Sequence, residues 1–495
     1  MAEIWAAMSV DTFGFAIIGI ALGIFFGALP GFGGGAAMAI SLPIAITLSP
    51  LNAMVFLISI YGGVNYGDSL PACLIGVPGS PGSAPTAIDG FPMTRQGRAS
   101  EALAAGAVGS CAGATISVLA FIFLAPILAR FALKFGPPEF FMLVVFGLTV
   151  LASIDARGTA KTLFAGGFGI CLALVGADPY WGQSRMTFGA IELYEGIPFI
   201  PALLGLFCVS QMMLLIDDRV LAEPEDRQAP TMRGIIRGMG ACTLRVRIIL
   251  QSSLVGTVVG ALPGAGATIA AFLSYTLAKN TSSNPAAYGK GERDAVIASE
   301  AGNSSTVGGA LIPTFALGIP GSASTAILLG VMMYMGLRPG PRLFLEQMPL
   351  IQTLVIFLLF GCLMIGLFGA FAAKYFYQLT RVPLKILVPC TIATATLGAY
   401  TNRGEIFDIG VMLAMGLLGY ILVKLRYPLS AVVLGMVLGP LAERYFIQSV
   451  ELVNWDLRIF FASPICIALW VGIALSLIGS RVLAYRERKA HESAG

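Results

Sequence analysis

Long apolar stretches, separated by short polar ones, run along nearly the whole chain. Residues 12–29, 350–371 and 460–479 are clear examples. Each reaches or approaches the roughly 20 residues that a membrane-spanning helix needs. The pattern predicts helices at about 11–29, 36–48, 51–66, 99–131, 138–154, 161–177, 196–216, 247–263, 266–278, 295–312, 349–373, 383–399, 405–423, 427–441 and 458–480. We therefore expect an all-α, polytopic membrane protein.

Composition supports this prediction and excludes several functions. Of the 495 residues, 57% are hydrophobic and 11% are charged, against about a quarter charged in soluble proteins. The net charge of +4 is small and gives no reason to expect nucleic-acid binding. The only histidine is His491, and the sequence has no HExxH, GxSxG or P-loop motif. The eight cysteines form no CxxC pair, and we expect them to be buried free thiols.

The basic residues suggest an orientation. If the N-terminus lies outside and the segments around Pro78 and Pro320 dip into the membrane and return, 22 of the 30 Lys and Arg residues lie on the cytoplasmic side. Such a bias is what the positive-inside rule produces. The C-terminus is then cytoplasmic.

Two phrases occur twice, in the same order. "GALPGFG" at 27–33 returns as "GALPGAG" at 260–266, and "PGSAPTAI" at 81–88 returns as "PGSASTAI" at 320–327. Because matched phrases in matched order indicate internal duplication, the chain is expected to contain two repeats. The first copy follows a helix that runs inward and the second a helix that runs outward, so the repeats are predicted to be inverted in the membrane.

This reading divides the chain into four parts. The first inverted repeat covers 1–216, with a re-entrant hairpin at about 70–90, and a solvated cytoplasmic linker covers 217–246. The second repeat covers 247–457, with a hairpin at about 313–336, and a last helix and basic cytoplasmic tail cover 458–495. Inverted repeats with broken helices are a recurring architecture of secondary transporters, whose substrate site lies where the copies meet.

The broken segments point to an anion. Proline and glycine interrupt the helices at "LPGFGGG" and "GVPGSPGS", and unpaired backbone groups at membrane depth are costly unless a partner satisfies them. A helix that begins after Pro-Gly-Ser presents free N–H groups and serine hydroxyls. The candidate contacts for a carboxylate substrate are Gly31, Gly33, Pro78, Gly79, Ser80, Gly82, Ser83 and Thr86 in the first copy and Gly264, Gly266, Pro320, Gly321, Ser322, Ser324 and Thr325 in the second. The alternative is that these residues only form turns and helix caps.

Polar clusters at 61–69 and 300–309 add further candidates. Asn65 and Asn303 are expected to occupy comparable places in the two copies, and Asn303 is followed by Ser304 and Ser305. These oxygens suit Na⁺ as well as a carboxylate-bearing substrate, although polar clusters can also simply join neighbouring helices.

Two carboxyl groups lie beside these clusters. Asp68 and Glu300 are candidates for ion coupling, with Na⁺ or H⁺ as the coupling ion, because an ionisable group in a membrane is costly to bury. The predicted helix limits place both near helix ends, where a solvated carboxylate needs no functional explanation. Asp89 is expected to fix a turn, and no other cofactor is predicted.

Four stretches carry a family resemblance: "GALPGFGGG", "YGGVNYGDS", "GVPGSPGSAPTAIDGFPMTRQGRASEAL" and "EAGNSSTVGGALIPTFALGIPGSASTAILLG". In these the sequence resembles the large membrane subunit of the tripartite tricarboxylate transporters, the TctA type. The resemblance implies a permease of the bacterial inner membrane that works with a small four-helix membrane subunit and a periplasmic solute-binding protein. It also implies ion-driven uptake of carboxylates such as citrate, and related architectures suggest an elevator-like movement.

Two alternatives remain open at this stage. One is the large subunit of a related binding-protein-dependent dicarboxylate transporter. The other is a membrane-embedded enzyme that uses Asp68, Asp89 or Glu300 as acid or base, although the sequence offers no histidine or metal set beside them.

Overall fold

The computed structural model describes residues 9–29, 32–154, 159–178, 180–217, 230–262, 266–379 and 384–478. The first half contains helices α2 (Val10–Gly27), α3 (Gly34–Ala45), α4 (Pro50–Gly67), α5 (Ser69–Ile75), η1 (Pro81–Ser83), α6 (Ala84–Arg95), α7 (Ala99–Ala132), α8 (Pro137–Ile154), α9 (Thr159–Ala173), η2 (Ile191–Leu193), α10 (Phe199–Leu203), η3 (Leu204–Val209) and α11 (Ser210–Asp217). Two short strands, β1 (Gly176–Ala177) and β2 (Ser184–Arg185), pair antiparallel.

The second half is also helical. It contains α12 (Met232–Cys242), α13 (Val246–Ala261), α14 (Gly266–Thr281), η4 (Pro285–Ala287), α15 (Arg293–Leu317), α16 (Ala323–Tyr334), α17 (Pro341–Glu346), α18 (Met348–Leu379), α19 (Leu384–Arg403), α20 (Ile406–Lys424), α21 (Leu429–Glu451), α22 (Ile459–Ala462) and a helix at Pro464–Ile478. The predicted all-α architecture is confirmed.

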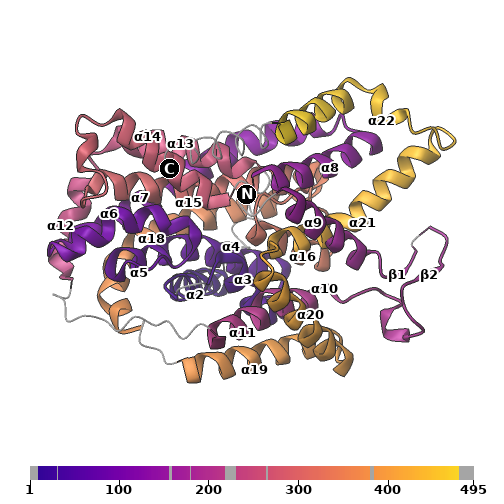
Figure 1. Cartoon of the computed structure of the whole chain (residues 1–495), viewed down its shortest axis with the longest axis horizontal. Helices are drawn as coiled ribbons and strands as arrows, with labels where there is room; N and C mark the ends of the chain where they lie inside the picture. Colours follow the sequence, from indigo (N-terminus) through magenta and orange to yellow (C-terminus); the bar gives the residue numbers. More distant parts are fainter. Residues whose placement is uncertain are drawn as a thin grey trace, which may run out of the picture.

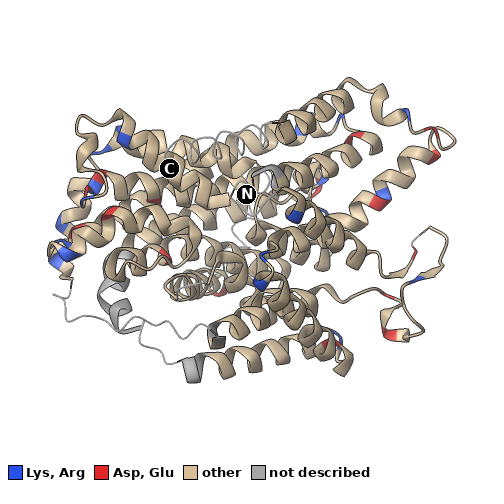
Figure 2. Cartoon of the chain, in the orientation of Figure 1, with Lys and Arg blue, Asp and Glu red and all other residues tan. Residues whose placement is uncertain are grey.

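Five of the described helices are long and apolar enough to cross a membrane, or six if the bent pair of α12 and α13 counts as one span. Large apolar side chains such as Phe123, Ile127 and Leu254 are exposed on the helical surface. Charged residues gather around α12 on the left and around α21 and α22 on the right, while the helices between them are mostly tan with scattered blue and red segments (Figure 2). This distribution is what a polytopic membrane protein requires, because its apolar belt faces lipid.

Helix α15 is the centre of the fold. It packs against α7, α13 and α14, and every residue from Ala295 to Ala316 is buried (Figure 1). Helices α2 and α4 form a second close pair beside it. Close approach depends on small residues, because a Cβ added at Gly23 would collide with the carbonyl oxygen of Ile60.

The remaining helices surround this centre. Helix α21 packs against α8 and α9, and α20 packs against α10, η3 and α11. Helix α16 contacts α3 and α4 of the first half as well as α21, so the second hairpin lies against both halves of the chain.

Part of the expected linker is a helix. Residues 232–242 form α12, which lies on α7 with Ile235 and Cys242 buried and with Arg233 and Arg237 exposed. The apolar pattern predicts no helix here because three glycines and two arginines interrupt it. The one-sided burial of Ile235 and Cys242 explains why this short stretch is helical: a single apolar stripe covers α7.

Candidate functional site

The two Pro-Gly-Ser hairpins share one backbone conformation from the left-handed glycine to the serine cap. Hairpin 1 comprises α5, η1 and α6, and hairpin 2 comprises the end of α15 and α16. The first helix of each ends on a left-handed glycine, Gly76 at φ 75° and Gly318 at φ 73°. Four residues later an extended serine, Ser80 or Ser322, closes a capping box. The expectation of a helix break and a new helix start at each phrase is confirmed.

Glycine contacts give a register for the two copies. A Cβ added at Gly79 would collide with the carbonyl oxygen of Gly27 and with Asp68. A Cβ added at Gly321 would collide with the carbonyl oxygen of Gly260 and with Ala310. Asp68 therefore matches Ala310.

The same register gives further matched pairs of residues. Ser80 matches Ser322, Gly82 matches Ser324, and Tyr61 matches Asn303. Gly34, seven residues after Gly27, matches Ala267 in the same way.

This register corrects two expectations. The phrase "PGSAPTAI" aligns Ser83 with Ser322 by letters, but the backbone and the capping boxes pair Ser80 with Ser322. The reason is that the second Pro-Gly-Ser of hairpin 1 forms an additional turn, η1, before α6 begins. The comparable placement of Asn65 and Asn303 is also wrong, because Asn65 matches Val307.

Around hairpin 1 the matched residues form a polar cluster, the hairpin-1 site, defined by Asp68, Ser80, Gly82, Ala267 and Asn303. Ser80 Oγ donates to Asp68 Oδ2, and Asn303 Nδ2 donates to Asp68 Oδ1 at 3.3 Å. A Cβ added at Gly82 would lie 2.5 Å from Asn303 Oδ1 and 3.1 Å from Ala267. Asp68 and Asn303 are fully buried, and Asn303 Oδ1 has no hydrogen-bond partner within the described residues. The cluster joins a hairpin of the first half to helices of the second.

Glu300, on α15, is a second buried carboxyl group that contacts hairpin 1. Thr86 Oγ1, from α6, donates to Glu300 Oε1 at 2.5 Å, and Ser110 Oγ, from α7, donates to Oε2 at 2.8 Å. The expected placement of Asp68 and Glu300 at solvated helix ends is wrong, because both are fully buried and α15 begins two turns before Glu300. No described Lys or Arg forms an ion pair with either group.

The matched residues around hairpin 2 form the hairpin-2 site, defined by Tyr61, Ala310, Ser322, Ser324 and Gly34. Tyr61 Oη lies 3.1 Å from Ser322 Oγ. A Cβ added at Gly34 would lie 2.6 Å from Ser324 Oγ. The hairpin of the second half thus meets the first turn of α3 from the first half.

Helix starts at both sites are candidates for anion binding. No side chain caps α3 at its N-cap residue Gly33, and a Cβ added there would meet no atom within 4 Å. Gly266 begins α14 at φ 66°, also with open space beside it. The candidates Gly31 and Gly264 lie outside the described residues.

The other candidates are spread more widely. Asn303 Nδ2 donates to the carbonyl oxygen of Asn65 at 3.1 Å, and Ser304 Oγ donates to the same oxygen at 3.5 Å. Ser305 packs instead against Gly256 of α13 and donates to its own helix, away from both hairpin tips. Ser83 is buried beneath Ser80, and Thr325 completes the capping box of α16.

Sequence reasoning missed Tyr61 and Ser110 and understated Asp89. Asp89 is buried and accepts hydrogen bonds from the N–H groups of Gly289, Gly291 and Glu292 and from Tyr275 Oη. It does fix a turn, as expected, but the turn belongs to the other half of the chain. Contacts between residues far apart in the sequence leave no local pattern. Tyr61 does lie in the polar cluster "YGGVNYGDS", which is the one signal that points to it.

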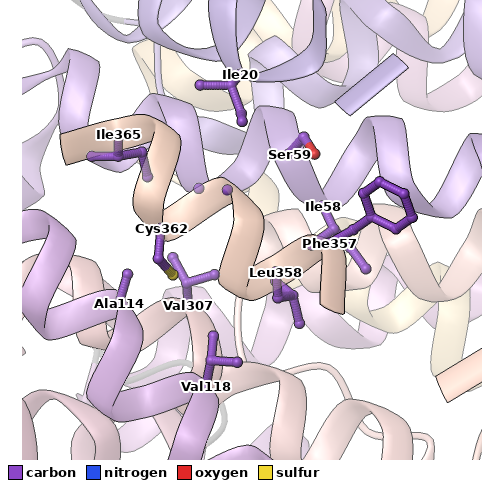
Figure 3. A pocket seen from close by; sticks show the side chains of 12 residues that line it. Ile20, Ile58, Ser59, Ala114, Val118, Val307, Phe357, Leu358, Cys362 and Ile365 are labelled. Carbon is purple, nitrogen blue, oxygen red and sulfur yellow. The ribbon is translucent and has the colours of Figure 1, made fainter. Parts of the chain in front are cut away.

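A small cavity of about 20 Å³ lies between α2, α4, α7, α15 and α18 (Figure 3). Ile20, Phe357, Leu358 and Ile365 are among its lining residues, and Ser59 supplies its only hydroxyl group. An apolar cavity of this kind does not fit a carboxylate.

Buried polar hairpins inside a helical body with an apolar surface define a polytopic helical membrane protein with broken-helix sites between its two halves. The family model of the "Tripartite tricarboxylate transporter TctA family" matches residues 13–434. The chain belongs to this family, and it is therefore a subunit of a transporter.

Two curated relatives come from Agrobacterium vitis. The "Uncharacterized 52.8 kDa protein in TAR-I ttuC' 3'region" is 34% identical over 93% of this chain and 91% of its own length. The "Uncharacterized protein in TAR-II ttuC' 3'region" is 30% identical over 44% of this chain and 90% of its own length. No solved structure gives a significant match to the chain.

Proposed function

We propose that the chain is the permease subunit of a binding-protein-dependent tripartite transporter and that an ion gradient drives its uptake of tricarboxylates or other carboxylates. Membership of the TctA family supports the transport function. The observation that carries the proposal is the meeting of each hairpin with a helix start from the other half, because helix N-termini bind anions without a buried arginine.

The proposed partners are a small four-helix membrane subunit and a periplasmic solute-binding protein. The proposed location is the bacterial inner membrane, with the N-terminus in the periplasm and the C-terminus in the cytoplasm. The two hairpins would then enter from opposite faces as parts of inverted repeats, and an elevator-like movement would carry them.

Ion coupling is assigned to hairpin 1. Asp68 and Glu300 are buried, accept hydrogen bonds only from neutral groups, and have no described cation beside them. A proton or a Na⁺ ion would supply the missing positive charge. For Na⁺, the oxygens at hand are the carboxyl group of Asp68, the unpartnered Asn303 Oδ1 and the backbone carbonyl of Asn65.

The test is uptake of labelled citrate, succinate or tartrate into proteoliposomes that hold the complete complex. Accumulation under an imposed Na⁺ or proton gradient, without ATP, is the expected result. A verified ligand of the binding protein that fails to accumulate under either gradient would refute the proposal.

Two variants connect uptake to the hairpins. Ser80→Leu and Ser322→Leu should each abolish uptake, because a leucine side chain displaces the hydroxyl group and fills the space beside the helix start. Both variants should still insert in the membrane, as a fluorescent C-terminal fusion would show. Unchanged uptake by both variants would show that the hairpins do not take part in transport.

A further inference from the structure

The two matched sites differ in charge. At the hairpin-1 site the residue behind the serine cap is Asp68, and at the hairpin-2 site the matched residue is Ala310. We propose that the substrate carboxylate binds only at the hairpin-2 site, between the first turns of α3 and α16, because Asp68 already occupies the equivalent position at hairpin 1. The inference rests on the proposed function and specifies which hairpin takes the anion.

Asp68 acts at hairpin 1 as a tethered carboxyl group. Its oxygens accept from Ser80 Oγ and from Asn303 Nδ2 at 3.3 Å. These are the donors that a substrate carboxylate would otherwise use at this helix start. Glu300, bound to Thr86 of the same hairpin, adds a second acidic group. An anionic substrate would meet like charge here unless cations were bound.

The hairpin-2 site has the opposite character. Among the described residues, no carboxyl group hydrogen-bonds to residues 318–325, and the methyl group of Ala310 stands where the first copy has a carboxyl group. Without a carboxyl group at this position, the hydrogen-bond donors of hairpin 2 have no protein carboxylate to bind. A substrate carboxylate can take that place.

Ser324 gives independent support for a ligand at this place. The residue is only 5% exposed, and Ser324 Oγ makes no hydrogen bond within the described part of the chain, although this atom is not fully enclosed. It lies against Gly34, in the first turn of α3, whose N–H groups no side chain caps. Ser324 Oγ is therefore available as a hydrogen-bond donor to a ligand at this helix start.

Two helix N-termini therefore meet at Ser324. Helix α3 contributes the open N–H groups that follow Gly33, and α16 contributes its positive end. Tyr61 Oη, 3.1 Å from Ser322 Oγ, adds a hydroxyl that can turn toward an anion. The matched residue at the hairpin-1 site is Asn303 of α15, which donates to Asp68 instead.

The decisive variant is Ala310→Asp, with Ala310→Asn as its matched control of nearly the same size. The Asp side chain would reach Ser322 as Asp68 reaches Ser80, and it would place a like charge against the substrate. In proteoliposomes with the complete complex, we expect gradient-driven uptake to fall at least about tenfold below that of Ala310→Asn. Equal uptake by the two variants would overturn the inference.

A second measurement does not depend on inserting a charge into a buried site. Ser324→Cys, in a background whose eight native cysteines are replaced, should react with a small thiol reagent. The carboxylate that the wild type accumulates should slow this labelling at least about threefold at ten times its KM. Labelling that is equally fast with and without substrate, in a variant that still transports, would also overturn the inference.

These outcomes separate the inference from the proposed function. If the wild-type complex accumulates no carboxylate, the proposed function fails. If it accumulates one and Ala310→Asp behaves like Ala310→Asn, the function stands and the assignment of the anion to hairpin 2 is wrong.

Discussion

Hairpin 1 and hairpin 2 begin with the same left-handed glycine and the same serine cap, but their surroundings differ. Hairpin 1 is held by three carboxyl groups, those of Asp68, Asp89 and Glu300. Hairpin 2 is surrounded by hydroxyl groups and backbone N–H groups, with Ala310 in the place of Asp68. The comparison teaches that two hairpins of similar backbone can present opposite electrostatic surroundings through a few side chains.

The largest effect should come from Asp89, which attaches hairpin 1 to the other half of the chain. Asp89→Ala leaves three backbone N–H groups and Tyr275 Oη without their acceptor. Buried donors without partners cost about 1–3 kcal/mol each, so we expect a loss of about 3–5 kcal/mol in stability. Thermal unfolding of the detergent-solubilised protein measures it.

Asp89→Asn is the matched control for this prediction. It keeps one acceptor oxygen and should recover part of the lost stability. A melting temperature for Asp89→Ala equal to that of the wild type would show that the contact between Asp89 and residues 289–292 does not hold the hairpin.

The next effect concerns ion coupling at hairpin 1. Asp68→Asn keeps the size of the side chain but removes its charge, and we expect gradient-driven uptake to fall roughly 10- to 100-fold, since hydrogen bonds to charged groups contribute about 1.5–3 kcal/mol. Exchange of labelled for unlabelled substrate, which needs no net ion movement, should fall much less. If gradient-driven uptake and exchange fall equally, Asp68 has no specific role in ion coupling.

Removing either serine cap should have a smaller effect, and the affected parameter should differ between the two sites. Ser322→Ala should raise the KM for substrate about fivefold, because a lost helix cap costs about 1 kcal/mol. Ser80→Ala should instead raise the ion concentration that gives half-maximal uptake by a similar factor. The same change in both parameters for both variants would contradict the division between the hairpins.

The smallest effect is expected at Gly33. Its φ of −76° suits any residue and its surroundings are open, so Gly33→Ala should fold normally. The new methyl group would stand beside the open N–H groups of α3 and raise the substrate KM about two- to threefold, within roughly 1 kcal/mol. An unchanged KM would argue that the substrate does not reach this helix start.

Most of the architecture could be predicted from the sequence because membrane-spanning helices are long, mostly apolar segments. The long apolar runs became α2, α7, α18, α20 and α21, and the repeated glycines and prolines marked both hairpins. Helix α12 escaped prediction because only one side of it is apolar and glycines interrupt the pattern.

The site was predicted less completely than the fold. Ser80, Ser322, Asp68 and Glu300 were identified from local phrases, and the structure places all four at the hairpins. Their asymmetry could not be predicted, because "PGSAPTAI" and "PGSASTAI" look equivalent while the extra turn η1 changes which residues correspond. Contacts such as that of Tyr61 with Ser322 join residues far apart in the sequence, and no local pattern encodes them.

The presence of both hairpins in one polypeptide has a consequence for mutagenesis. In a symmetric homodimer every substitution changes two equivalent sites at once. Here Ser80 and Ser322, or Asp68 and Ala310, can be changed one at a time, and the other hairpin keeps its native side chains. Each hairpin therefore serves as an internal control for the other.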